Sequence, residues 1–265
     1  MFRLLTDPQS SITPTQRNVI NQFVSATGAS VRVATSYLRA HGWNIDVAVS
    51  EYYDGSGVGG ASAKKDTKAL TAIFDKYKDP EDPSTIGLDG TIAFIQDDLG
   101  IDLEDPFVLA LACKLEAPTV GQFSKDGFIK GWQALNADSI PKMKKACEKL
   151  RSEYATDMDL FKQVYRFTFT FVRPPGQRNL PIETAVEYWN LLLGDKFPSP
   201  EVLKSWTTFV QEEYKRVISK DTWNMLWEFN ESVLKSEQGL DSYDPEGAWP
   251  SIFDEYVAYT KKSKE

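Results

Sequence analysis

Histidine and cysteine are scarce in this chain of 265 residues, and acidic residues outnumber basic ones; each of these features argues against a class of function. There is one histidine, His41, and there are two cysteines, Cys113 and Cys147. A zinc cluster needs more of these ligands in spaced groups, and a secreted disulfide framework needs more cysteines. The net charge of −8 and the isoelectric point near 4.9 argue against the basic surface of a nucleic-acid-binding protein.

Long apolar runs are also missing. No segment is long enough to cross a membrane, and the apolar part of M-F-R-L-L-T-D-P at the N-terminus is too short for a secretory signal. We therefore expect no membrane partner, and residence in the cytoplasm and nucleus. The chain is 42% hydrophobic and 26% charged, which is typical of a globular protein with a sizeable core.

Residues 8–54 are predicted to form a compact bundle of three helices. Thr13 and Pro14 can begin the first helix, and Ser30 can cap the second. The turn H-G-W-N at 41–44 separates the second helix from a third. The pattern F-x-x-x-T-G-A-S, followed by G-W-N-I-D-x-A-V-x-x-Y-Y, resembles a ubiquitin-associated domain.

The first loop of this bundle leaves its function open. Ubiquitin-associated domains commonly carry a Met-Gly-aromatic trio there, whereas this chain has Thr27-Gly28-Ala29, so only the glycine matches. One interpretation is a module that binds ubiquitin or another protein of ubiquitin-like fold. The other is a helical bundle with a weak or accessory surface.

Residues 55–65, G-S-G-V-G-G-A-S-A-K-K, are predicted to form a flexible linker by composition. Gly55, Gly57 and Gly60 match the nucleotide-binding pattern G-x-G-x-x-G. That loop requires a strand before it and a helix opening at its end. A helix precedes these glycines and polar linker follows them, so we interpret the match as coincidence.

Residues 66–262 are predicted to form a larger helical domain, which makes the whole chain all-α. Two segments within it repeat the pattern D-G-x-I, at 89–92 and 126–129, and each opens a helix after a loop. A repeated helix-loop-helix with an apolar loop residue resembles a paired EF-hand.

The oxygen ligands of a calcium site are missing from both loops. A loop beginning at Asp79 would need glycine at its sixth position and glutamate at its twelfth, but Ser84 and Gly90 occupy these positions. The second loop, P-T-V-G-Q-F-S-K-D-G-F, offers almost no carboxylates. We expect EF-hand-like architecture without metal, and no cofactor. A calcium sensor is a third functional hypothesis.

The C-terminal region, from Ile218 to Tyr259, has a polar start and two amphipathic stretches. Ser219 is placed to cap a helix that has Asp221 in its first turn, where a carboxylate favours the helix dipole. In the last helix, the pattern puts Ala248 and Asp254 on a face opposite the aromatic side chains. An acid beside a small residue suits a partner's Lys or Arg, although a solvated helix face is the simpler interpretation.

Several motifs in one order resemble the defective-in-cullin-neddylation family. They are I-G-L-D-G at 86–90, F-T-F-T-F-V-R-P-P-G-Q at 167–177, E-Y-W-N-L-L-L at 187–193, I-S-K-D-T-W at 218–223, and D-x-Y-D-x-E-G-A-W-P-x-x-x-D-E in the last stretch. The resemblance covers nearly the whole chain after the first fifty-odd residues. It implies a scaffold-type co-ligase that helps to attach a ubiquitin-like modifier to cullins.

The resemblance also implies partners and binding residues. Asp221, Ala248 and Asp254 match the family's acidic patch for the C-terminal region of a cullin. A RING subunit and the neddylation conjugating enzyme are the other implied partners, and nothing points to an oligomer. An apolar pocket would receive the acetylated N-terminal methionine of the conjugating enzyme. Eight residues are predicted to line it: Leu88, Val108, Leu111, Leu115, Phe123, Phe171, Tyr188 and Leu191.

An enzyme with its own nucleophile is the hypothesis that the residues favour least. Cys113 lies in an apolar helical pattern, and Cys147 lies beside Lys144 and Lys145, which could lower the pKa of its thiol. Neither has a histidine or a matched acid near it in sequence. We expect a scaffold without a catalytic residue of its own. A ubiquitin-binding adaptor without co-ligase activity is the alternative.

Overall fold

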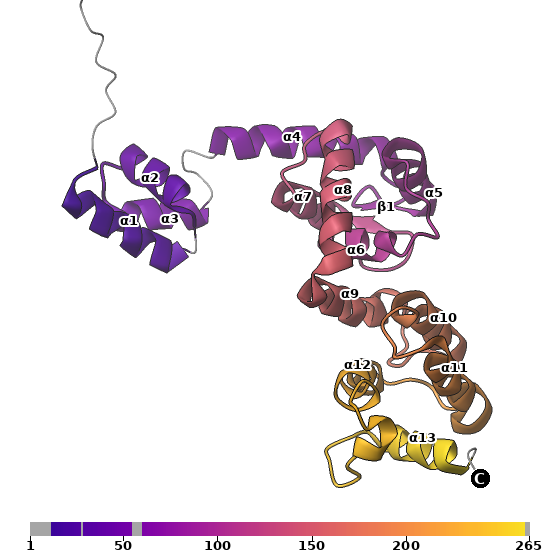
Figure 1. Cartoon of the computed structure of the whole chain (residues 1–265). Coiled ribbons are helices and arrows are strands. Elements are labelled where there is room, and N and C mark those ends of the chain that lie inside the picture. Colours follow the sequence, from indigo (N-terminus) through magenta and orange to yellow (C-terminus); the bar gives the residue numbers. More distant parts are fainter. Residues whose placement is uncertain (1–11, 28, 55–59, 263–265) are drawn as a thin grey trace, which may run out of the picture. The chain divides into compact units, whose positions relative to one another are not determined.

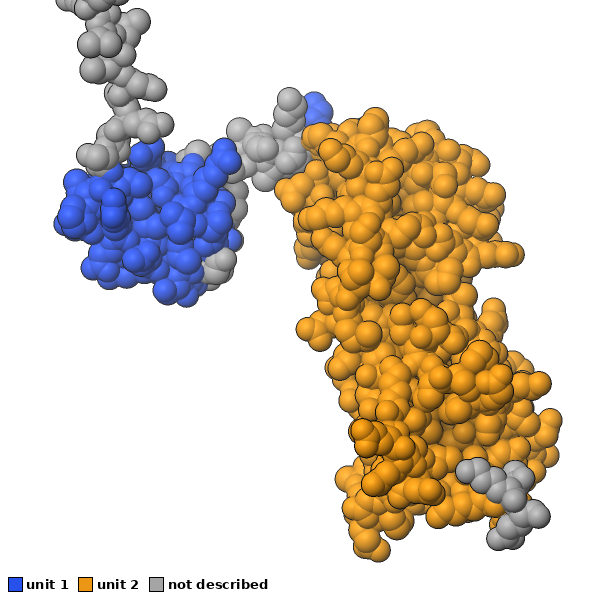
Figure 2. Space-filling model, in the orientation of Figure 1, with its two compact units in different colours: residues 1–68 blue, residues 69–265 orange. Residues whose placement is uncertain are grey.

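The computed structural model describes residues 12–27, 29–54 and 60–262 (Figure 1). The chain divides into two compact units, residues 1–68 and residues 69–265 (Figure 2). Each unit has its own cluster of buried hydrophobic side chains. No helix within the described residues combines the length and the apolar character needed to span a bilayer.

The first unit is the expected bundle of three helices: α1 (Pro14–Thr27), α2 (Val31–Ala40) and α3 (Ile45–Asp54) (Figure 1). Its core is built on Phe23, which packs edge-on against Tyr52 with ring centroids 5.5 Å apart. Ser30 caps α2 by accepting a hydrogen bond from the Val33 backbone N–H at 3.3 Å. Residues 8–11 and Gly28, which the sequence assigned to this bundle, lie outside the described residues.

The predicted linker is partly wrong. Helix α4 spans Gly60–Tyr77, so residues 60–65 are helical, and residues 55–59 lie outside the described residues. The prediction from composition was wrong here because Ala61, Ala63 and the two lysines at 64 and 65 are good helix formers. They extend the helix that follows them toward the N-terminus. The glycine pattern thus does open a helix, but it still follows α3 and not a strand.

The second unit begins with two helix-loop-helix pairs joined by two short strands. Strand β1 (Thr85–Ile86) pairs antiparallel with β2 (Phe123–Ser124), with Ile86 opposite Phe123. This confirms the EF-hand-like architecture, although the sequence had no alternating pattern to predict the strands. The flanking elements are α4, α5 (Leu88–Ile92) with a π-helical turn (Ala93–Leu99), α6 (Phe107–Lys114) and α7 (Lys125–Ala134).

The two D-G motifs have the same packing role in each pair. Gly90 lies against the carbonyl oxygen of Tyr77, at the end of α4. Gly127 lies against the carbonyl oxygen of Leu115, just after α6. A Cβ atom at either position would overlap that oxygen, so the glycine allows the second helix of each pair to approach the end of the first.

The acids of the first loop bind their own backbone. One oxygen of Asp79 accepts the N–H groups of Glu81 and Asp82, and Asp82 accepts from the N–H and the hydroxyl of Ser84. In the described parts of the chain, no group of three His, Cys, Asp or Glu side chains is placed to hold a metal ion.

The rest of the second unit is helical. Phe167, Phe169 and Phe171 alternate in sequence, as apolar residues of a strand do, but they lie in helix α9. Helix α11 (Pro200–Phe209) passes into a π-helical turn (Val210–Tyr214), and Lys215 then has a left-handed backbone with φ +53°. The helices are α8 (Ile140–Thr156), α9 (Met158–Phe171), α10 (Ile182–Leu193), α11 (Pro200–Phe209), α12 (Lys220–Phe229) and α13 (Ser251–Lys262).

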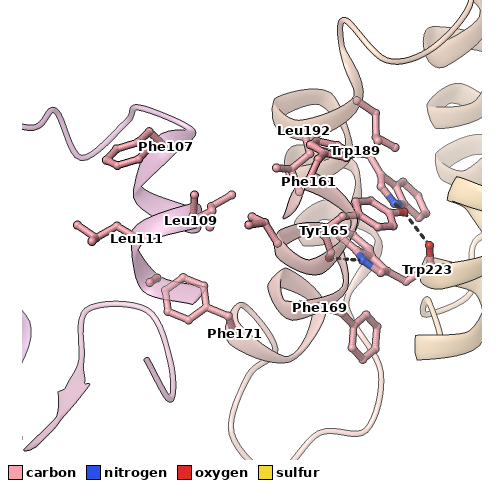
Figure 3. Close-up of a cluster of buried hydrophobic side chains, with 14 of the residues drawn as sticks. Phe107, Leu109, Leu111, Phe161, Tyr165, Phe169, Phe171, Trp189, Leu192 and Trp223 are labelled. Carbon is pink, nitrogen blue, oxygen red and sulfur yellow. Dashed lines mark hydrogen bonds between the residues drawn. The ribbon is translucent and has the colours of Figure 1, made fainter. Parts of the chain in front are cut away.

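A reciprocal pair of hydrogen bonds joins α9 to α12 in the core of this region (Figure 3). The Tyr165 hydroxyl donates to the carbonyl oxygen of Trp223 at 2.7 Å, and the Trp223 indole N–H donates to the carbonyl oxygen of Tyr165 at 2.9 Å. The Trp189 indole N–H of α10 donates to the same hydroxyl at 3.3 Å. All three side chains are fully buried, and burial raises the pKa of Tyr165 well above its usual range.

We expect Gly90→Ala to lower the free energy of unfolding of the second unit by about 2–3 kcal/mol, because the added methyl group forces α5 away from α4. The matched control is Gly176→Ala: Gly176 has φ +77° with open space around it, so that change costs about 1 kcal/mol of backbone strain alone. Urea unfolding measures both. Equal losses for the two variants would contradict the packing role of Gly90.

Candidate docking sites

A cavity of about 700 Å³ opens at the EF-hand-like half of the second unit. Its walls come from α5 with the following turn, from α6, from the loop before β2, and from α10. Phe171, the last residue of α9, completes it. The side chains that bound its interior are mainly apolar, among them Ile92, Ile95, Val108, Leu109, Ala112 and Phe123.

Exposed apolar side chains gather at this cavity. Leu88 is 62% exposed, Val120 55%, Leu191 40% and Leu103 37%, and all four line it. Elsewhere in the described residues, large exposed apolar side chains are Val31, Val33, Val47, Met158 and Val217, and none of these lines the cavity. Apolar surface concentrated around one cavity is typical of a binding site for an apolar group of a partner.

Six of the eight predicted pocket residues line the cavity: Leu88, Val108, Phe123, Phe171, Tyr188 and Leu191. Leu111 and Leu115 do not, which corrects the predicted lining of the pocket. Helix α6 turns Val108, Leu109 and Ala112 to the cavity, whereas Leu111 is fully buried in the core behind it. Leu115 follows the last residue of α6 and packs against Gly131 of α7.

The sequence also missed residues that the structure adds to the cavity. Ile92 and Ile95 recur at helical spacing after Leu88, a signal that could have identified them. Ala112 and Gln122 carry no such signal. Thr91 lines the cavity as well, and its hydroxyl donates to the carbonyl oxygen of Gly121 at 3.1 Å, which ties α5 to the loop before β2.

Polar groups stand at the rim. The carboxylates of Glu104 and Glu187 are exposed there, and Asp105 is paired with Arg151 at 2.6 Å. The amides of Gln122 and Asn190 and the hydroxyl of Tyr188 can hydrogen-bond a peptide group. Burial raises the pKa of Tyr188, so its hydroxyl remains a donor at neutral pH.

The predicted acidic patch begins at α12. The Ser219 hydroxyl accepts the backbone N–H of Thr222 at 3.0 Å, as the sequence predicted, and Asp221 is exposed in the first turn. Trp223, Leu226 and Trp227 are buried on the opposite face. The cap therefore fixes where α12 begins and leaves Asp221 on its solvent side.

Ala248 does not lie on a helix face, which corrects the helical wheel. Helix α13 begins at Ser251, and Ala248 is exposed in the segment before it. The half-buried Trp249 anchors this segment by packing on Phe229 and Phe253, with ring centroids 5.7 and 5.8 Å apart. Gly247 lies against the Trp249 ring, which explains why a residue without a side chain precedes Ala248.

Asp254 and Glu255 follow one another on α13, but their surroundings differ. The Tyr243 hydroxyl donates to Oδ1 of Asp254 at 2.8 Å, and Asp254 is exposed. The Arg216 guanidinium donates to both oxygens of Glu255, at 2.5 and 2.6 Å. Since Arg216 lies between α11 and α12, this ion pair joins the segment that leads to Asp221 to the helix that carries Asp254.

Neither cysteine is activated. Burial raises the pKa of both Cys113 and Cys147 to about 11. The charge of Arg151 lowers the pKa of Cys147 only in part. Both side chains are therefore neutral thiols at pH 7, which are poor nucleophiles.

Each of the two units contains residues that match a known protein family. A family model described as cullin binding matches residues 142–259, and one described as a UBA-like domain matches residues 17–58. Three relatives are each named Defective in cullin neddylation protein 1. The one from Yarrowia lipolytica is 41% identical over 92% of this chain and 96% of its own length. Those from Caenorhabditis elegans and Cryptococcus neoformans are 30% and 32% identical over 94% and 93% of this chain, and 90% and 94% of their own lengths.

The cavity assignment predicts a contrast between two leucines. Leu111→Ala is expected to lower the free energy of unfolding by about 2–5 kcal/mol, because it leaves a void in a closed core. Leu191→Ala removes a side chain that water already reaches and is expected to cost less than about 1 kcal/mol. Urea unfolding of the two variants measures the difference. A larger loss for Leu191→Ala would place that residue in the core and not at the cavity.

Proposed function

Since the chain belongs to the defective-in-cullin-neddylation family, we propose that it promotes transfer of the ubiquitin-like neddylation modifier to cullins as a non-catalytic scaffold. The observation that carries the proposal is the cullin-binding match over residues 142–259, which contains Asp221, Ala248 and Asp254. The same unit also holds the apolar cavity. Two docking surfaces on one folded unit suit a protein that brings two partners together.

In this proposal the cullin binds at Asp221, Ala248 and Asp254. Two exposed carboxylates attract the basic C-terminal region of a cullin, and the small side chain of Ala248 leaves room for the stem of a Lys or Arg. Charge complementarity of this kind speeds encounter and fixes orientation.

The cavity accepts the N-terminus of the conjugating enzyme. A methionine side chain fits an interior lined by Ile95, Val108 and Ala112, and an uncharged acetamide can bind the polar groups of Gln122, Asn190 or Tyr188. Free ammonium is disfavoured inside, because it would lose its water among apolar side chains and the carboxylates stand only at the rim. N-terminal acetylation removes that charge.

Catalysis then arises from proximity. Holding the charged conjugating enzyme near the acceptor lysine of the cullin makes an encounter between two partners effectively intramolecular. The bond-making groups belong to the conjugating enzyme and a RING subunit, and the raised pKa of both cysteines fits a scaffold without its own nucleophile.

A ubiquitin-binding adaptor is the second candidate, because residues 17–58 match a UBA-like domain. The first loop weakens this reading: the Ala29 side chain is buried, and the Thr27 hydroxyl accepts the backbone N–H of Ala29 at 3.2 Å. Ala29 therefore presents little apolar surface to a partner. Two further statements stay predictions: that the protein is a monomer, and that it works in both the cytoplasm and the nucleus.

We expect Asp254→Arg and Ala248→Arg each to weaken cullin binding at least about tenfold, because they place a cation where the partner's own cation binds. Isothermal titration of a cullin C-terminal fragment measures the affinity. Reconstituted transfer with conjugating enzyme and RING subunit, with and without the protein, measures the consequence.

Lys261→Ala is the control for the cullin variants, since Lys261 is exposed near the end of α13, two turns from Asp254. Unchanged affinity in both Arg variants would contradict the patch assignment. No stimulation of transfer by the intact protein would contradict the scaffold and favour the ubiquitin adaptor.

For the cavity, we expect an acetylated N-terminal peptide of the conjugating enzyme to bind at least about tenfold more tightly than its unacetylated form, because only the latter carries an ammonium into the apolar interior. Leu191→Asp is expected to abolish the binding. Met158→Asp is the matched control: Met158 is 43% exposed and does not line the cavity. Fluorescence anisotropy of a labelled peptide measures both. Equal affinity of the two peptides would contradict the proposed ligand.

A further inference from the structure

The carboxylate of Asp254 has a fixed internal donor although it stands in solvent. Oδ1 accepts the Tyr243 hydroxyl at 2.8 Å, while no hydrogen bond to Oδ2 from any other described residue is found. Tyr243 lies in the segment between the 3₁₀ turn (Gly239–Ser242) and α13, well before Asp254 in the chain. An exposed aspartate is free to rotate about its side-chain bonds unless a neighbour holds it.

From this contact we propose that Tyr243 is a positioning residue for cullin binding: its hydroxyl fixes the Asp254 carboxylate so that the second oxygen faces the partner's cation. The inference rests on the proposed function, since it assigns Asp254 to the cullin surface. Tyr243 itself need not touch the partner. It acts by removing the rotational freedom that binding would otherwise have to remove.

The Tyr243 ring is held firmly enough for this role. It packs edge-on against Phe229 and at a tilt against Trp249, with ring centroids 5.8 and 6.3 Å apart. Its backbone N–H donates to the carbonyl oxygen of Leu240 at 3.2 Å. Ring and backbone are thus both anchored, and the hydroxyl is presented to Asp254 from a fixed direction.

The hydroxyl keeps its proton across the physiological range. Burial raises the pKa of Tyr243, and the neighbouring charge of Asp254 raises it further. The hydroxyl therefore donates, and the Asp254 carboxylate accepts. A carboxylate that accepts a hydrogen bond in this way can also bind a partner's Lys or Arg through its second oxygen.

Glu255, the acid that follows Asp254, has a partner within the chain, so of these two only Asp254 is left to bind a cation of the cullin. Glu255 is occupied by Arg216, whose guanidinium also lies 4.1 Å from the centre of the Tyr214 ring. Of two consecutive carboxylates on α13, one is neutralised within the chain and the other is oriented outward. The patch therefore offers a single directed acceptor on α13, and this restricts where a partner's cation can bind.

The same side chain sets the position of Ala248. Trp249, the residue after Ala248, packs on Tyr243 and on Phe229. Tyr243 thus connects two of the three predicted cullin-binding residues. Removing only the hydroxyl separates its effect on Asp254 from the ring's effect on Ala248.

The test is Tyr243→Phe in the full chain, which keeps the ring and removes the hydroxyl. We expect cullin affinity, measured by isothermal titration, to fall by a factor of about five to ten, which is the size of a hydrogen bond to a charged group diluted by solvent exposure. The matched control is Tyr256→Phe. Tyr256 lies on α13, and its hydroxyl donates a hydrogen bond to the Ser205 hydroxyl at 3.3 Å. This variant also removes one hydroxyl and is expected to leave cullin affinity unchanged.

A double-mutant cycle with Asp254→Ala distinguishes positioning from a general structural role. Once the carboxylate is absent, Tyr243→Phe should have no further effect on affinity, because its only target is gone. Thermal unfolding of every variant confirms that the fold is kept. A full effect of Tyr243→Phe in the Asp254→Ala background would overturn the proposal.

Two failures can be told apart. If Asp254→Ala itself leaves cullin affinity unchanged, the patch assignment fails and the positioning role fails with it. If Asp254→Ala weakens binding but Tyr243→Phe does not, the proposed function stands and only the role of Tyr243 is wrong.

Discussion

The reciprocal hydrogen bonds between Tyr165 and Trp223 join α9 to α12 in the core of the second unit. These two helices lead to the cavity and to the acidic patch. In a dry core each of these polar groups would be costly if left unpaired, so the pair permits one relative placement of α9 and α12. Helix α9 ends at Phe171, in the wall of the cavity, and α12 carries Asp221 in its first turn. One buried contact thereby sets the relation between the two surfaces proposed as docking sites.

A scaffold that works by proximity needs such rigidity. The rings of Phe161, Tyr165, Trp223 and Trp227 form one cluster, and those of Phe229, Tyr243, Trp249 and Phe253 form another beside it. Aromatic side chains bury a large area while losing little rotational freedom. The second cluster also explains the E-G-A-W motif: Trp249 anchors the segment, Gly247 makes room for its ring, and Ala248 is left at the surface.

Local signals predicted the parts of this protein that local physics controls. Ser30 and Ser219 were recognised as caps, because capping depends on a hydroxyl and the few residues after it. The D-G repeat predicted the EF-hand-like pair, although neither strand could be predicted: a two-residue strand has no period and exists only through its partner. The left-handed backbone of Lys215, which follows the π-helical turn after α11, likewise carried no signal in the sequence.

The sequence by itself determined an all-α chain of two units, the family and the residue types at its surfaces, because helical periodicity, caps and ordered motifs are written along the chain. Tertiary structure decided which side chains face which way. Leu111 and Val108 are equally apolar, and only the packing of α6 on its neighbours sends one to the core and the other to the cavity. Asp254 and Glu255 are adjacent acids, and only the approach of Tyr243 and Arg216 from distant segments orients the first and neutralises the second. Such differences depend on contacts between residues far apart in sequence, which no local pattern encodes.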